Sequence, residues 1–67
     1  MGLARTFGLN VRRLRQERGL TQEALADEVQ LAVTYVGQLE RGRRNPTLAV
    51  VERFGRVFRV DPVELLR

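Results

Sequence analysis

An uncharged stretch with a few specific recognition groups runs from Gln30 to Leu39. The amide of Gln38 can make a two-pronged hydrogen bond to adenine, the hydroxyl of Thr34 can bond a base or a phosphate, and Val33 can touch a thymine methyl. The alternative is that these three side chains are ordinary exposed residues of a helix. These side chains therefore indicate a binding function, with contacts suited to the edges of nucleic-acid bases.

The composition argues against catalysis. The chain has no histidine and no cysteine, which removes the usual general base near neutral pH, the usual zinc ligands and any disulfide. Eight carboxylates remain, and no pair of them stands out from solvated surface charge. We therefore expect no enzyme, metal site, cofactor or small-molecule ligand. No stretch approaches the roughly 20 apolar residues of a membrane span, so a soluble, intracellular protein is expected.

Positive charge is divided between the two ends of the chain. All twelve basic residues are arginine, and the net charge is +4. Residues 1–20 and 41–67 each carry a net charge of +4, whereas residues 21–40 carry −4. Guanidinium groups make forked contacts with phosphates, so the basic segments fit phosphate clamps on either side of the uncharged stretch. The alternative is that scattered arginines only solvate a small helical surface.

The pattern in residues 22–40 predicts two helices that meet at a corner. Apolar residues recur one helical turn apart, the pattern breaks near Gln30, and it then resumes with a different phase. Small Ala26 lies where the second helix would pack closest. This is the pattern of a helix-turn-helix, which leaves the outer face of its second helix free to enter a major groove. The apolar positions are Leu25, Val29, Leu31, Val36 and Leu39.

Turn and capping signals divide the chain into short helices, and no strand pattern persists. The first helix should run from about residue 3 or 7 to residue 18, with Gly19 as its C-terminal cap. Thr21 should cap the second helix, and the third should span about residues 32–41 and stop at Gly42. These signals predict an all-α protein.

Two further helices complete the expected single domain of residues 1–67. Thr47 should cap the fourth helix, and Asp61 should cap a short fifth helix with Pro62 in its first position. The fifth helix is expected to run to the end of the chain. The residues expected to point inward from the fourth helix are Leu48, Val51, Phe54 and Phe58.

Two motifs at this spacing resemble a known family. They are Leu20-Thr21-Gln22 at the start of the second helix and Leu39-Glu40-Arg41-Gly42 at the end of the third. With them, the chain looks like the small repressors of phages lambda and 434 and their Cro proteins, the Cro/C1-type or XRE-like helix-turn-helix regulators. Further matching positions are Arg15, Gly19, Leu25, Ala26, Tyr35, Val36, Asn45-Pro46-Thr47 and Asp61-Pro62-Val63-Glu64-Leu65.

The resemblance implies a five-helix, lambda-repressor-like domain whose second and third helices form the helix-turn-helix. It implies a sequence-specific transcriptional regulator that binds a pseudo-palindromic operator in double-stranded DNA as a homodimer, with residues 32–41 in the major groove. Phage-type repressors and restriction–modification controller proteins both fit, in the cytoplasm and nucleoid of a bacterium. The alternative is an antitoxin-like or other protein-interaction module with the same fold.

The resemblance also implies roles for individual side chains. The base-reading positions of the family match Val33, Thr34 and Gln38. A buried ion pair between Arg15 and Glu40 is implied, which would tie the first helix to the end of the third. Contacts with the DNA backbone are implied for Gln22, Tyr35, Arg41, Arg43 and Asn45.

Three positions depart from the family pattern. The corner usually holds glycine where this chain has Gln30, and a positive φ would cost about 1 kcal/mol there. Ala32 replaces the usual serine or threonine cap, and Gly37 replaces a residue with a side chain, each at a cost of about 1 kcal/mol. These changes predict a recognition helix of low stability in the free protein that becomes more ordered when it binds DNA.

A dimer interface is expected near the end of the chain. One helix-turn-helix reads only a few base pairs, so two copies should read half-sites about 34 Å apart. Val57, Val63 and Leu66 offer more apolar surface than one small core should bury. The alternative is that these three residues complete the core of the monomer.

Overall fold

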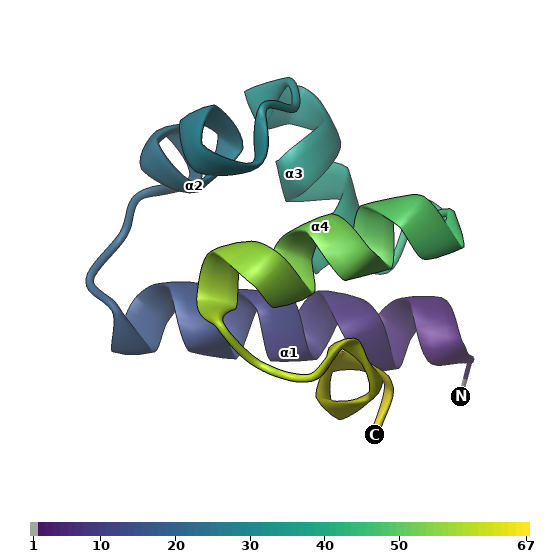
Figure 1. Ribbon diagram of the computed structural model, residues 1–67. Helices are drawn as coiled ribbons and strands as arrows, with labels where there is room; N and C mark the ends of the chain where they lie inside the picture. The colour runs from purple at the N-terminus through teal and green to yellow at the C-terminus, as the bar shows by residue number, and fades with distance from the viewer. Residues whose placement is uncertain (1) are drawn as a thin grey trace.

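A computed structural model describes residues 2–67, which form four α-helices and one short 3-10 helix (Figure 1). The all-α class is as predicted, and no strand occurs among residues 2–67. In this part of the chain no helix has the length and apolar character needed to cross a bilayer. The elements are α1 (Leu3–Glu17), α2 (Gln22–Val29), α3 (Val33–Glu40), α4 (Leu48–Phe58) and η1 (Pro62–Leu66).

The helices begin where the capping residues predict. The hydroxyls of Thr21 and Thr47 each accept a hydrogen bond from the backbone N–H three residues ahead, at 3.0 and 3.1 Å. Asp61 accepts one from the N–H of Val63 at 3.0 Å. Each bond satisfies a backbone donor that a helix start leaves without a partner. The glycine that follows α1, Gly19, has the positive φ expected of a C-terminal cap.

The fifth predicted helix is the 3-10 helix η1, so the count of five α-helices is not confirmed. The N–H of Glu64 donates to the carbonyl of Asp61 at 2.8 Å, which is the three-residue bond of a 3-10 turn. The carbonyls of Leu65 and Arg67 accept hydrogen bonds from the Asn10 amide instead, at 2.9 and 3.1 Å. A side chain of α1 therefore fixes the position of η1 under the core.

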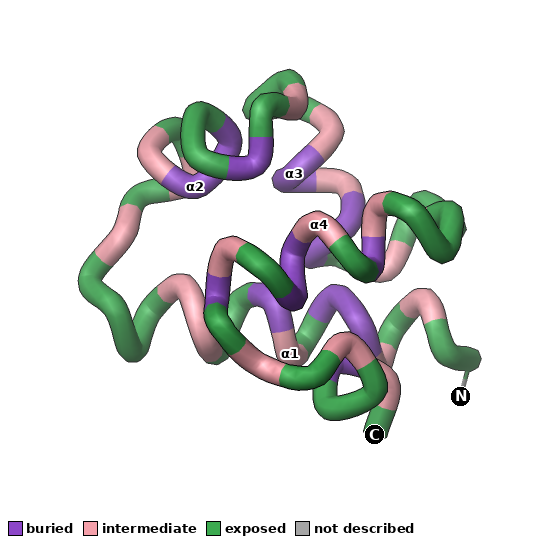
Figure 2. The backbone as a smooth tube through the Cα atoms, viewed as in Figure 1, coloured by how far each residue is buried: buried purple, intermediate pink, exposed green. Residues whose placement is uncertain are grey.

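The core lies where α1, α4 and η1 meet the underside of α2 and α3 (Figures 1 and 2). The rings of Phe7 and Phe54 pack edge to face with centroids 5.5 Å apart. Leu48 was expected to point inward, and this was wrong, because the side chain is 78% exposed at the first position of α4. The buried apolar residues are Phe7, Val11, Leu25, Ala26, Val29, Val36, Leu39, Val51, Phe54, Phe58 and Leu65.

Two arginines serve the fold by binding the carbonyl ends of helices. Arg18 donates to the carbonyl of Phe58 at the end of α4, and its guanidinium lies 5.3 Å from the centre of the Phe58 ring. Arg53 donates to the carbonyl of Val29 at the end of α2, at 3.2 Å. A cation at a helix C-terminus is favourable. Not all of the arginines are therefore free to contact DNA phosphates.

Candidate nucleic-acid interface

The corner between α2 and α3 is held in a left-handed conformation by a residue other than glycine. Gln30 has φ 59° and ψ 48°, and the next N–H, that of Leu31, donates to the carbonyl of Ala26 at 3.0 Å. Ala32 is the N-cap of α3, and its methyl group makes no capping bond. Two local costs of about 1 kcal/mol each therefore fall directly before α3.

The outer face of α3 holds the predicted base-reading residues. Val33 is 40% exposed, Thr34 is exposed and Gln38 is half-buried. Val36 and Leu39 lie on the opposite face, inside the core. The helix thus presents an uncharged surface to solvent, as the amphipathic pattern requires.

A buried ionic brace joins the inner side of α3 to α1 and α2. The Arg15 Nε lies 2.7 Å from Oε2 of Glu40, and the side chains of the two residues are 14% and 2% exposed. Gln22 donates from Nε2 to Oε1 of Glu40 at 3.1 Å, and Arg15 also donates to the carbonyl of Leu20 at 2.9 Å. The hydrogen bond to Glu40 raises the pKa of the Arg15 guanidinium above its usual value. These bonds fix the orientation of α3 relative to α1 and α2.

The turn after α3 carries exposed polar side chains. Gly42 has φ 72°, and the N–H of Arg43 donates back to the carbonyl of Gln38 at 2.9 Å, which closes the helix end. Arg41, Arg43 and Asn45 are all exposed. Arg41 and Arg43 directly follow α3, which suits the predicted contacts with DNA phosphates, whereas Asn45 also lines an apolar pocket formed with α1 and α4.

Arg44, in the same turn, contacts two side chains of α3. Its Nη1 donates to Oε1 of Gln38 at 3.0 Å, and its guanidinium lies 5.0 Å from the centre of the Tyr35 ring. Tyr35 and Gln38 are one helical turn apart, so both present their side chains to Arg44. A single sequence carries no signal for this contact, because it depends on where the turn folds back over α3.

Gly37 lies on the inner side of α3, close to the brace. A Cβ added there would meet Nη1 of Arg41 at 3.4 Å and the amide of Gln22 at 3.7 Å, which are ordinary contacts with flexible side chains. We predict that Gly37→Ala stabilises the protein by about 1 kcal/mol, because alanine has the higher helix propensity. Thermal unfolding followed by circular dichroism should show a rise in Tm of roughly 4–8 °C. A lower Tm would mean that α3 needs glycine for packing.

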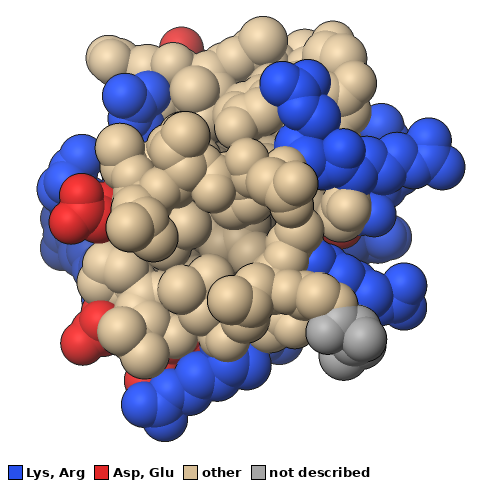
Figure 3. Space-filling model, turned by 90° about the vertical axis from the view of Figure 1, so that its right-hand side faces the viewer, with Lys and Arg blue, Asp and Glu red and all other residues tan. Residues whose placement is uncertain are grey.

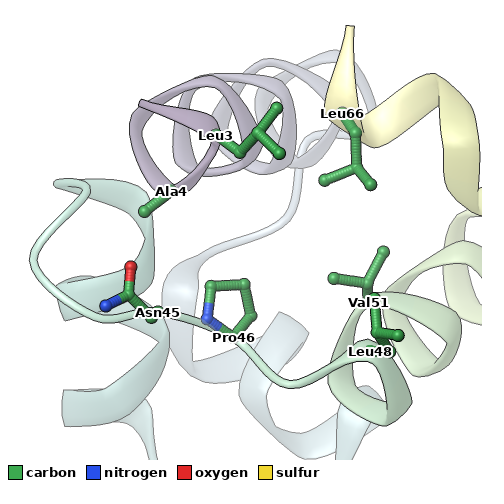
Figure 4. A pocket seen from close by; sticks show the side chains of 7 residues that line it. All are labelled: Leu3, Ala4, Asn45, Pro46, Leu48, Val51 and Leu66. Atoms are coloured by element: carbon green, nitrogen blue, oxygen red, sulfur yellow. The ribbon is translucent and has the colours of Figure 1, made fainter. Parts of the chain in front are cut away.

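The three predicted dimer residues differ in their exposure, and both Val57 and Leu66 pack against the core. Val57 is half-buried against the core near the end of α4, and Val63 is 52% exposed on η1. Leu66 instead lines an apolar pocket of about 150 Å³ at the opposite end of α4 (Figure 4). Exposed Leu3 and Leu48, which sequence analysis did not assign to an interface, flank the same pocket. The pocket is lined by Leu3, Ala4, Asn45, Pro46, Leu48, Val51 and Leu66.

The face that includes this end of the molecule is mostly uncharged. Figure 3 shows a hollow near its centre with uncharged atoms around it, and charged side chains around its rim, with the arginines most numerous on the right. Exposed apolar surface of this kind marks an interaction site more often than an isolated exposed leucine does. The uncharged hollow therefore lies inside a rim of charged side chains.

Comparison with known proteins agrees with this geometry. A family described as a helix-turn-helix domain matches residues 6–67. An uncharacterised HTH-type transcriptional regulator from Sinorhizobium fredii is 39% identical over 98% of this chain and 86% of its own length. The restriction–modification controller protein C.AhdI from Aeromonas hydrophila has a TM-score of 0.86 at 39% identity, over 92% of this chain and 94% of that one. The controller C.Esp1396I, solved as a nucleoprotein complex, has a TM-score of 0.83 at 31% identity, over 97% of this chain and 84% of that one.

Proposed function

The chain belongs to the helix-turn-helix family of DNA-binding transcriptional regulators, and from this premise we propose that it binds a pseudo-palindromic operator as a homodimer. In this proposal α3 enters the major groove and reads bases through Val33, Thr34 and Gln38. The observation that carries it is the uncharged outer face of α3, held outward by the buried brace on its inner side.

Phosphate contacts on both sides of α3 complete the proposed interface. Arg41, Arg43 and Asn45 follow α3 and are exposed, and Tyr35 is half-exposed on it. One N–H of the Gln22 amide donates a hydrogen bond to Glu40. The other N–H can donate to a phosphate oxygen near the start of α2. With several such contacts, the affinity for DNA should fall steeply as the salt concentration rises.

The apolar pocket beside Leu66 is the proposed dimer contact. Leu3 and Leu48 add exposed apolar surface next to it, whereas Val57 packs on the core of its own chain. Val63 extends the apolar surface of η1. Two copies that meet through this face would present two α3 helices to one side of the duplex, one helical turn apart.

The regulator is further proposed to be of the restriction–modification controller type, acting on DNA at the bacterial nucleoid. The support is its likeness to the controller protein C.AhdI, with a TM-score of 0.86 at 39% identity over 92% of this chain. Phage-type repressors remain the other class with the same fold and the same mode of binding. An operator next to genes for an endonuclease and a methyltransferase would distinguish the controller type.

We predict that Gln38→Ala lowers affinity for the operator by about 1–3 kcal/mol, because the main polar contact with a base edge is lost. The fold should remain intact, since Gln38 is on the outer face. Fluorescence anisotropy with the operator and with a scrambled duplex of equal length measures both affinities. The matched control is Gln16→Ala, which removes an exposed glutamine from α1. An equal loss on both duplexes would mean that Gln38 does not read sequence.

A further inference from the structure

The outer face of α3 carries a contact that changes what Gln38 can recognise. Arg44 reaches back from the turn after α3, donates to the amide oxygen of Gln38 at 3.0 Å and stacks on the ring of Tyr35. The turn itself is closed on α3 through the backbone bond from Arg43 to the carbonyl of Gln38. Arg44 is therefore presented from a fixed backbone position, with a planar guanidinium that needs little further ordering.

The contact fixes which way the Gln38 amide faces. A guanidinium has donors and no acceptor, so only the oxygen of the amide can meet it. The Nε2 group of Gln38 is then directed away from Arg44 and is available to donate. Arg44 also keeps further N–H donors that the bond to Gln38 does not use. Together the two side chains present a surface made mainly of donors.

Base edges differ in how well they suit such a surface. Adenine offers an acceptor at N7 and a donor at N6, so its two-pronged bond with glutamine needs the amide oxygen. That oxygen keeps a second lone pair, but an adenine amino group bound there would lie next to the guanidinium. Two hydrogen-bond donors would then face each other, which is unfavourable. Guanine offers acceptors at both N7 and O6 in the major groove. It can accept from Gln38 and from Arg44 at the same time.

We propose that Arg44 is a specificity-determining residue that directs Gln38 to guanine instead of adenine. This rests on the proposed function of Gln38 as a base reader. It revises the expectation from residue type alone, since an isolated glutamine favours adenine. Tyr35 contributes by holding the guanidinium over α3 through a cation–π contact.

The test is selection of binding sites from a random duplex pool with four versions of the full chain. These are the unmodified protein, Arg44→Ala, Gln38→Ala and the matched control Arg43→Ala. Arg43 is exposed in the same turn and carries the same charge, so its loss reports on phosphate contact alone. The position that Gln38 reads is the one whose base preference disappears in Gln38→Ala.

At that position the unmodified protein and Arg43→Ala should select guanine over adenine by about tenfold, within the range that a two-pronged contact provides. Arg44→Ala should select adenine. The same preference in Arg44→Ala and in the unmodified protein would overturn the proposal while leaving Gln38 as a reader. Adenine selected by the unmodified protein would also overturn it. If no selected base responds to Gln38→Ala, both the reader and the role of Arg44 are refuted.

Discussion

Gly8→Ala is expected to destabilise the protein by more than about 3 kcal/mol, beyond the usual cost of overpacking a core. Gly8 is buried in α1 at the point where the end of α3 crosses it. A Cβ there would lie 2.9 Å from the carbonyl oxygen of Glu40 and closer still to that of Leu39. Both neighbours are backbone atoms, so the clash can be relieved only by moving one helix away from the other.

Chemical denaturation followed by circular dichroism measures this loss. A chain of this length has a total stability of roughly 3–10 kcal/mol, so the Gly8→Ala variant should lose about a third of its stability or more. Gly37→Ala is the matched control, because it also adds a methyl group to a buried helical glycine, with room for it. Equal stabilities for the two variants would show that α1 and α3 do not approach as closely as the structure has them.

Glu40→Ala should cost about 3–5 kcal/mol, because it leaves the charge of Arg15 largely buried without its carboxylate. The Glu40 side chain is 2% exposed and accepts hydrogen bonds from both Arg15 and Gln22. Removing it also frees Gln22, so any protein that remains folded should bind DNA less tightly. Denaturant unfolding gives the stability, and anisotropy under folding conditions gives the affinity.

The control for Glu40→Ala is Glu17→Ala, which removes the carboxylate of an exposed ion pair. Glu17 lies 3.2 Å from Arg13 within α1, and both side chains are more than half exposed. Exposed pairs of this kind contribute about 0.3–0.5 kcal/mol. A loss in Glu40→Ala no larger than that in Glu17→Ala would refute a structural role for the buried brace.

The local signals of the sequence were sufficient to predict where α2, α4 and η1 begin. Thr21, Thr47 and Asp61 cap helices through their own side chains, and Gly19 and Gly42 take the positive φ that a helix end favours. These features depend on residues only two or three positions apart, which a single sequence displays directly. The left-handed conformation of Gln30 could be expected only from the family resemblance, because the family usually has glycine at this corner.

Features that depend on distant contacts could not be predicted. Gly8 has no special pattern around it, and its importance arises only because the end of α3, about 30 residues away, crosses α1 there. Arg18 and Arg53 contributed to the expected basic surface, yet both bind carbonyls at helix ends. Leu48 matched the inward periodicity of α4, but the first turn of α4 extends past the core to the rim of the pocket. Tertiary placement decided each of these cases.

In the proposed function, two copies of the outer face of α3 read one operator. Selection from a random duplex pool, followed by sequencing of the enriched duplexes, tests it most directly. We expect two inverted half-sites with centres about 10 base pairs apart. A chain with Val33, Thr34 and Gln38 all replaced by alanine should lose that preference. Enrichment of no sequence at low salt, or of the same sequence by the triple variant, would contradict it.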